Sequence, residues 1–218
     1  NWEGSFWEVQ EPFPVKASLR INYEDGAGKA TERVVDIRQF GSDLYGNLLI
    51  GRCRLRNATR TFRTDRIKKC IDEETGEIVE EVFAYLRAKY ESSPECTLDK
   101  LYEEEYDTLR ILLYVGKADG QLRAAEKVII RDTCCALAND SRLTDALIDE
   151  MFSALDVPTL QAFKMAVGRL AQKSSDARAV LIKAAEDMAA TQKTVHPAEK
   201  EAIDYMHKRL AVAANAAL

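Results

Sequence analysis

The chain has 218 residues, of which 46% are hydrophobic and 31% are charged, and its formal net charge is −5. This composition excludes a disordered protein and predicts a globular one. No apolar run approaches the roughly 18 residues of a membrane helix, and no basic segment leads into an apolar one as in a secretory signal. We therefore expect no membrane span and a cytoplasmic location. The chain begins at Asn1 rather than Met, which is compatible with a piece of a longer protein that has an upstream domain.

The first part of the chain has the pattern of β-strands. Residues 15–23 alternate apolar and polar side chains, and residues 24–28 supply turn residues. Residues 31–38 and 48–55 predict two further strands, and residues 60–63 begin a return strand. Several short strands this close together indicate a small β-barrel that is closed or nearly closed.

From Gly76 onward the hydrophobic residues recur with the period of helices. Residues 78–86 begin an amphipathic helix, which residues 92–94 end. Later helix starts are predicted at residues with capping or first-turn preferences, namely Thr97, Thr144, Pro158, Ser175 and Pro197. These signals predict an all-helical bundle of six or seven helices.

The change of period predicts an α+β protein in three segments. A β-barrel domain covers residues 1–75, a connecting helix and linker cover 76–96, and a helical domain covers 97–218. The helical domain contains an internal echo, because residues 122–127 match residues 195–200 and both stretches end in Ala-Glu-Lys. Each has a Glu three residues into a helix, as in a capping box. The match fits either a duplicated hairpin or the common pattern of helix starts.

The net charge hides an asymmetry between the two parts. Residues 15–71 hold thirteen Lys and Arg against six Asp and Glu, a net of +7, so the rest of the chain carries −12. Such an imbalance bears on partners rather than on fold. It favours an anionic partner for the first part and a protein partner for the acidic remainder. Electrostatic pairing of the two parts, within one chain or in a homodimer, is the alternative.

Basic side chains are concentrated in the last strands of the first part. Between residues 52 and 69 only Asp65 opposes Arg52, Arg54, Arg56, Arg60, Arg63, Arg66, Lys68 and Lys69. Strand alternation would place the first three on one face. The planar fork of Arg grips phosphate or carboxylate with two hydrogen bonds, which favours an anion or nucleic-acid surface. A solvated strand face is the alternative.

The same stretch resembles the WYL domain over about residues 15–75. The resemblance lies in residues 19–23, 31–36, 49–53 and 60–67, of which the closing R-x-F-R-x-D-R-I is the most specific. It implies an Sm-like β-barrel that senses ligands, including nucleotides and nucleic acids, in bacterial transcription regulators and phage-defence proteins. The namesake Trp-Tyr-Leu falls on Asn47-Leu48-Leu49, with Tyr45 as a nearby aromatic.

By matched position, the resemblance implies that Arg33, Arg60, Arg63 and Arg66 line the ligand surface. Together with two residues of the basic stretch, they form the candidate ligand-binding set: Arg33, Arg52, Arg54, Arg60, Arg63 and Arg66. The expected ligand is an anion, either a nucleotide or a nucleic acid.

A second candidate site consists of acids in the helical part. Asp119 lies in a tight turn and Glu126 in the first turn of the next helix, where their oxygens could hold a hard cation. Residues 114–120 with Glu126, and the echo that ends at Glu199, resemble the TerB-like fold of tellurite-resistance and stress proteins over residues 97–212. That resemblance implies a divalent cation held by Asp119, Glu126 and Glu199. The alternative is an Asp-Gly turn and a Glu that favours a helix N-terminus.

The second copy of this pattern departs from the first, because Gln192-Lys193 replaces the Asp-Gly pair. One oxygen ligand is thereby lost and a positive charge is added. Nothing in the sequence surrounds His196 or His207 with the residues of a catalytic triad, and no phosphate-binding glycine loop is present. We therefore expect a regulatory ligand-sensing protein rather than an enzyme, with a metal-binding or scaffold protein of the stress response as the alternative.

The five cysteines form no metal-binding motif, since they contain no C-x-x-C and are accompanied by only two histidines. They are Cys53, Cys70, Cys96, Cys134 and Cys135. Reduced thiols are expected, and the adjacent pair is more typical of small buried helix residues than of a redox site.

Overall fold

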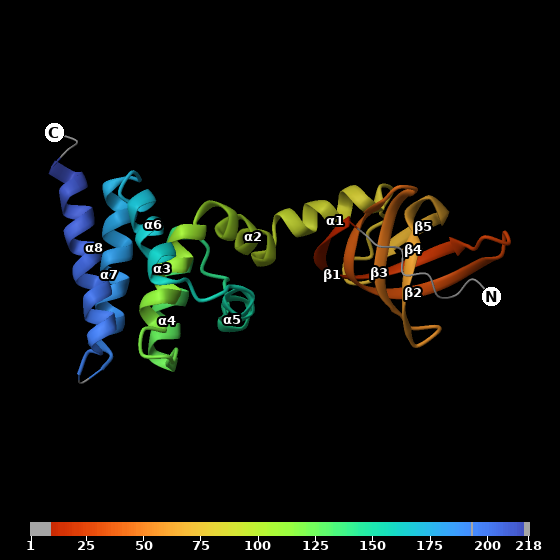
Figure 1. Ribbon diagram of the computed structural model, residues 1–218. Helices are drawn as coiled ribbons and strands as arrows, with labels where there is room; N and C mark the ends of the chain where they lie inside the picture. Colours follow the sequence, from red (N-terminus) through yellow and green to blue (C-terminus); the bar gives the residue numbers. More distant parts are fainter. Residues whose placement is uncertain (1–9, 193, 216–218) are drawn as a thin grey trace. The chain divides into compact units, whose positions relative to one another are not determined.

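The computed structural model describes residues 10–192 and 194–215, and the chain divides into two compact units with the boundary between residues 95 and 96. Over these described residues the first unit contains a five-stranded antiparallel sheet, and the chain as a whole contains eight α-helices (Figure 1). The α+β class expected from the change of period is therefore confirmed. None of the described helices has the length and apolar character needed to cross a membrane.

The sheet has the strand order β4-β3-β2-β1-β5. Its strands are β1 (Gln10–Glu24), β2 (Ala30–Asp43), β3 (Gly46–Cys53), β4 (Ala58–Arg63) and β5 (Ile67–Asp72), with a 3-10 turn η1 (Thr64–Arg66) before the last. The described strands have no ladder between β4 and β5, so the sheet is open and a closed barrel is not shown. Register shifts interrupt the pairing of β2 with both its neighbours, and such irregularities bend the strands, as Figure 1 shows.

Two strand boundaries differ from those expected. The second strand continues past residue 38 to Asp43, so the hairpin turn falls at residues 44–45. The third strand ends at Cys53, because the chain turns at residues 54–57 and Asn57 adopts a left-handed φ of 51°. Arg54 and Arg56 therefore lie in a turn and do not share a strand face with Arg52. Strand pairing with β2 ends here, and alternation within a sequence cannot locate such an end.

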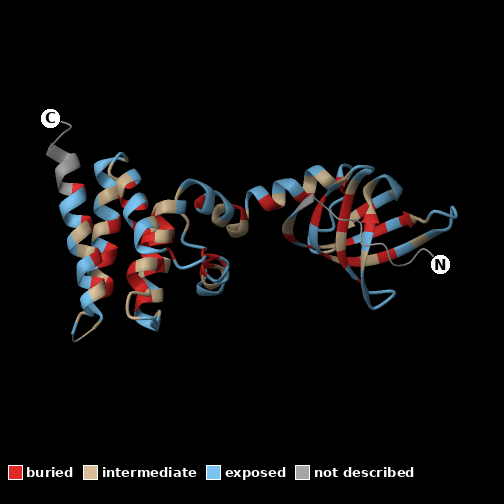
Figure 2. Cartoon of the chain, viewed as in Figure 1, coloured by how far each residue is buried: buried red, intermediate tan, exposed pale blue. Residues whose placement is uncertain are grey.

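The inner face of the sheet is apolar and is covered in part by α1 (Val82–Glu91). Strand alternation buries Leu19, Ile21, Val35, Ile37 and Phe40 on this face. The ring of Phe40 lies 5.3 Å from that of Phe83 and 6.4 Å from that of Tyr90. These aromatic contacts hold the helix against the sheet, since aromatic pairs add to the stabilisation from buried area. Figure 2 shows the buried residues along the strands.

The second unit is built from helices around the apolar α3. In chain order they are α2 (Pro94–Glu104), α3 (Tyr106–Gly116), α4 (Ala124–Ala138), α5 (Asp145–Ala154), α6 (Leu160–Leu170), α7 (Ser175–Ala190) and α8 (Pro197–Asn215). Helix α3 packs against α6, α7 and α8, and its residues 111–113 are fully buried. Together with α1, the described residues after Gly76 contain eight helices, one more than the six or seven that the sequence signals predict.

The predicted helix starts are correct in some places and displaced in others. Thr144 caps α5, and its hydroxyl accepts a hydrogen bond from the backbone N–H of Leu147. Helix α6 does not begin at Pro158, because Thr159 accepts from the backbone N–H of Ala162 and so becomes the cap. Thr97 is not a cap, since α2 already begins at Pro94. These displacements arise because competing capping residues stand close together in the sequence.

Candidate functional site

The inner face of the sheet carries an arginine. Arg33 pairs in register with Ile21 and has the same orientation as Val35, so strand alternation turns its side chain inward. Only 9% of Arg33 is exposed. Its guanidinium carbon lies 5.5 Å from the ring centroid of Tyr23 and 5.8 Å from that of Phe62. Two aromatic faces therefore hold the cation, which is a favourable electrostatic arrangement.

Among the described residues no carboxylate is in direct contact with the guanidinium of Arg33, and the charge of Asp25 acts on it only through space. Its Nε donates a 2.9 Å hydrogen bond to the hydroxyl of Thr31, and over the described residues no ion pair joins it to an acid. A buried charge is costly unless it is paired. An anion that reached this guanidinium would supply the missing partner.

Residues around Arg33 form a compact group, which we call the Tyr23 cluster: Tyr23, Arg33, Phe62 and Arg63. The rings of Tyr23 and Phe62 meet edge to face at 5.2 Å. The backbone N–H of Arg63 donates to the hydroxyl of Tyr23 at 3.4 Å. Arg60 has the same orientation on β4 as Phe62 and is half-buried, so it also belongs to the inner side.

Arg63 and Arg66 lie at the corner between β4 and β5. The guanidinium of Arg63 donates to both oxygens of Asp65, at 3.1 and 3.0 Å, and lowers the pKa of that carboxyl. Arg66 is exposed and lies against the β1–β2 turn, because a Cβ built on Gly26 would be 3.6 Å from its Nη1. Asp65 thus neutralises one arginine of this corner.

Arg52 and Arg54 lie apart from the Tyr23 cluster. Arg52 is exposed on β3, with an orientation opposite to that of the buried Cys53, and it donates to the side chain of Asn57. Arg54 donates to both oxygens of Asp36, at 3.0 and 2.7 Å, and lowers the pKa of that carboxyl. The six candidate arginines therefore divide between the inner face, the corner and the outer side of the sheet.

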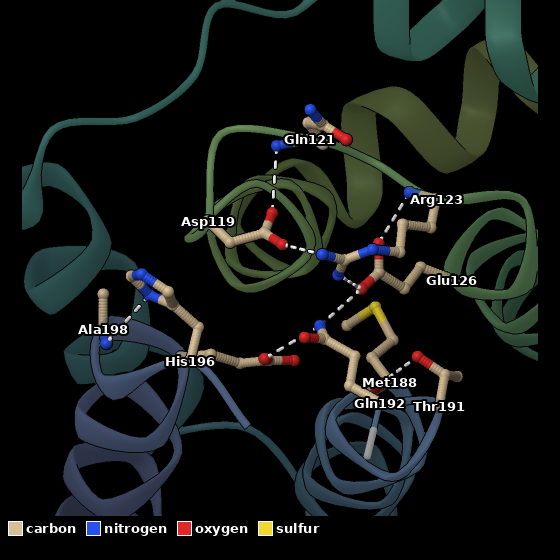
Figure 3. Close-up of polar contacts among 10 residues, drawn as sticks. Asp119, Gln121, Arg123, Glu126, Met188, Thr191, Gln192, His196 and Ala198 are labelled. Carbon is tan, nitrogen blue, oxygen red and sulfur yellow. Dashed lines mark hydrogen bonds and ion pairs between the residues drawn. The ribbon is translucent and has the colours of Figure 1, made fainter. Parts of the chain in front are cut away.

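Shared contacts with Gln192 and Arg123 bring together the three acids singled out in the helical part. Figure 3 labels Asp119, Glu126 and the two side chains that connect the group. Glu126 is 1% exposed, and its Oε2 accepts a 2.7 Å hydrogen bond from the backbone N–H of Arg123. Glu199 is 2% exposed. The amide Nε2 of Gln192 lies between them, 3.1 Å from Oε1 of Glu126 and 3.2 Å from Oε2 of Glu199.

Asp119 joins this group through Arg123. One Asp119 oxygen accepts from the backbone N–H of Gln121 at 3.0 Å, and the other forms an ion pair with the Arg123 guanidinium. Burial, followed by the negative charges of Glu126 and Asp119, raises the pKa of Glu199. The described residues include no group of three or more side chains placed to hold a metal ion.

The sequence alone does not identify two important parts of these sites. It predicts Tyr23 and Phe62 only as strand residues, although strand alternation already places Tyr23 on the inner face. For Gln192 it indicates only the loss of a ligand. The bridging position of Gln192 depends on Glu126, which is 66 residues away in the chain, and no local pattern reveals such a contact.

The cysteines form no disulfide in the described chain. Burial raises the pKa of Cys134 to about 12, and burial also raises the pKa of Cys135. A thiol must ionise to act as a nucleophile, so these shifts favour a structural role for the adjacent pair.

Comparison with known protein families gives a match within the first unit. The WYL domain family matches residues 15–71. The matched segment contains all six candidate arginines and ends within β5. No curated protein matches the chain.

One solved structure with some likeness is the proteasome accessory factor B/C (PafBC) of Arthrobacter aurescens, at a TM-score of 0.27 and 11% sequence identity. The alignment covers 99% of this chain and 53% of that one, so the chain spans about half the length of PafBC. A TM-score this low does not establish a shared fold.

Proposed function

We propose that the first unit binds an anionic ligand, a nucleotide or a nucleic acid, at the Tyr23 cluster, and that the protein is a ligand-sensing regulator. The observation that carries this proposal is Arg33, a residue that is 9% exposed, whose guanidinium is held on two rings and forms no direct ion pair with a carboxylate of the described chain. The match of residues 15–71 to the WYL domain supports the same role.

The arrangement suits phosphate better than a neutral ligand. The two rings restrain the planar fork of Arg33, so little conformational entropy would be lost when an anion accepts its hydrogen bonds. Half-buried Arg60 and exposed Arg66 add positive charge on the inner side and at the corner. We further propose that the bent sheet is of the Sm-like barrel type and that this site lies at its rim.

The second unit would then serve interaction or signalling rather than catalysis. Residues 96–218 hold sixteen Lys and Arg against nineteen Asp and Glu, a net charge of −3, and no stretch of this unit has the density of arginines found in residues 52–69. In this proposal the first unit senses the ligand, and the second unit transmits the signal to a partner.

The proposal is tested by the binding of a labelled single-stranded oligonucleotide and a fluorescent nucleotide, each measured by anisotropy across a salt series. Replacing Arg33 with Met removes the charge and keeps an unbranched side chain. We expect affinity to fall about tenfold or more, because a charged hydrogen bond contributes about 1.5–3 kcal/mol. The log–log slope of oligonucleotide affinity against salt should become shallower by about 0.7 for each phosphate that the variant no longer neutralises.

Arg54→Met is the matched control, since it removes the same charge from the turn after β3, at a position already paired with Asp36. Its affinity should stay within about twofold of wild type. Arg66→Met tests the corner at an exposed position where folding is not at risk. Equal binding by wild type, Arg33→Met and Arg66→Met would remove the proposal.

A further inference from the structure

Three buried or half-buried acids of the second unit contact the side chains of Gln192 and Arg123, which Figure 3 labels. Asp119 comes from the turn between α3 and α4, Glu126 from the first turn of α4, and Glu199 from the first turn of α8. A TerB-like resemblance implies that a divalent cation joins these acids. Whether they fit a cation depends on which of their oxygens are still available.

The acids do not fit a metal ion, because nearly all of their oxygens are already used. The backbone N–H of Gln121 and the guanidinium of Arg123 take the two oxygens of Asp119. Arg123 and Gln192 also occupy both oxygens of Glu126. Among the described atoms of these acids, only Oε1 of Glu199 is buried without a hydrogen-bond partner.

We infer that the amide of Gln192, together with the guanidinium of Arg123, takes the place of a divalent cation, and that it fastens the turn between α7 and α8 to α4 without metal. The amide Nε2 lies 3.1 Å from Glu126 and 3.2 Å from Glu199, and its two N–H groups allow one hydrogen bond to each. Arg123 supplies the full positive charge, through its contacts with Asp119 and Glu126.

The inference predicts what an acid at position 192 would do. Gln192→Glu keeps the length of the side chain but exchanges the donor for a third carboxylate among Glu126 and Glu199. Buried like charges repel strongly, and a hard cation with oxygen ligands relieves that repulsion. The substitution should therefore create the cation site that the wild-type amide occupies.

Thermal unfolding of the full chain, in chelator and then with calcium, magnesium or manganese, tests this inference. Wild type should keep the same midpoint under all four conditions. Gln192→Glu should unfold at lower temperature in chelator. At a cation concentration of roughly 100 times the dissociation constant, its midpoint should rise by about 5 °C or more for at least one metal.

Two further variants separate a cation site from general effects. Gln161→Glu places the same charge on the exposed side of α6 and should show no response to metal. Gln192→Met removes the bridging donor without adding an acid. This variant should unfold at a lower temperature than wild type, and metal should not change its midpoint.

A wild-type midpoint that rises with metal as much as that of Gln192→Glu would overturn the inference, and so would a Gln192→Glu protein that ignores all three cations. If Gln192→Glu does not fold in chelator, refolding is repeated with each cation present. Recovery of the helical signal then supports the inference, and failure to recover with any cation contradicts it.

Discussion

The hydroxyl of Tyr85 donates a 2.7 Å hydrogen bond to Oδ2 of Asp72, a residue with 0% of its surface exposed. Asp72 ends β5 and Tyr85 belongs to α1, so this contact joins the edge of the sheet to the helix that covers it. The ammonium of Lys89 lies 3.1 Å from the same oxygen, and two backbone N–H groups donate to the other oxygen. The buried carboxylate is thus fully partnered.

Replacing Asp72 with Asn should destabilise the first unit. The change removes the charge that Lys89 and Tyr85 contact, and a buried partner left unsatisfied costs about 1–3 kcal/mol or more. We expect a loss of about 2–4 kcal/mol in the free energy of unfolding, measured by urea denaturation. Tyr85→Phe removes one hydrogen bond and should cost about 1 kcal/mol. A loss for Asp72→Asn no greater than that for the exposed control Glu74→Gln would contradict this prediction.

The same carboxylate makes the first unit sensitive to acid. Burial alone would raise the pKa of Asp72, but hydrogen bonds from Tyr85, Thr75, Lys89 and Glu74 outweigh it, and the pKa lies well below its usual range. As pH falls, this carboxyl takes up a proton at a higher pH in the unfolded chain than in the folded protein. The carboxylate therefore stabilises the fold above the ordinary Asp pKa of about 4, and this stabilisation is lost as pH falls toward the folded pKa. Urea midpoints of the first unit should therefore decrease steadily below about pH 4. In Asp72→Asn this decrease should be shallower, and an unchanged slope would refute the assignment.

Glu199 should give the second unit the opposite pH dependence. Its pKa is raised, first by burial and then by Glu126 and Asp119, so the folded state holds the proton more tightly than the unfolded chain. Stability is then greatest below the ordinary Glu pKa of about 4.3 and falls as pH rises through the folded value. Glu199→Gln should flatten this decrease and raise the thermal midpoint at neutral pH. Equal thermal midpoints for wild type and variant from mildly acidic to neutral pH would show that the buried charge of Glu199 does not destabilise the fold.

Two glycines provide a matched pair of alanine substitutions. A Cβ on Gly51 would lie 2.5 Å from the carbonyl oxygen of Asp36 and 2.9 Å from the Cα of Ile37, and both obstacles are backbone of the neighbouring strand. Gly51→Ala should therefore destabilise the first unit by about 1–3 kcal/mol or more.

A Cβ on Gly168, within α6, would meet no atom within 4 Å, so Gly168→Ala should stabilise the second unit by about 0.5–1 kcal/mol. Thermal unfolding of both variants distinguishes these signs, and a tolerated Gly51→Ala would mean that β2 and β3 can separate.

The sequence by itself determined the broad division of the chain. Alternation over residues 15–23 predicted a strand that the structure contains within β1, and the helical period beyond Gly76 predicted the helices. The cap at Thr144 was also correct, because its hydroxyl acts within three residues of itself. Such features rest on local geometry, and local geometry is what a pattern of neighbouring residues encodes.

Only the tertiary structure decided which charged side chains meet. It placed Arg33 on two rings from different strands, paired Arg54 with Asp36, and set Gln192 between two glutamates. Each partner lies on another strand or helix. The energies of these contacts depend on burial and on distances across the fold, and neither quantity is contained in the order of neighbouring residues.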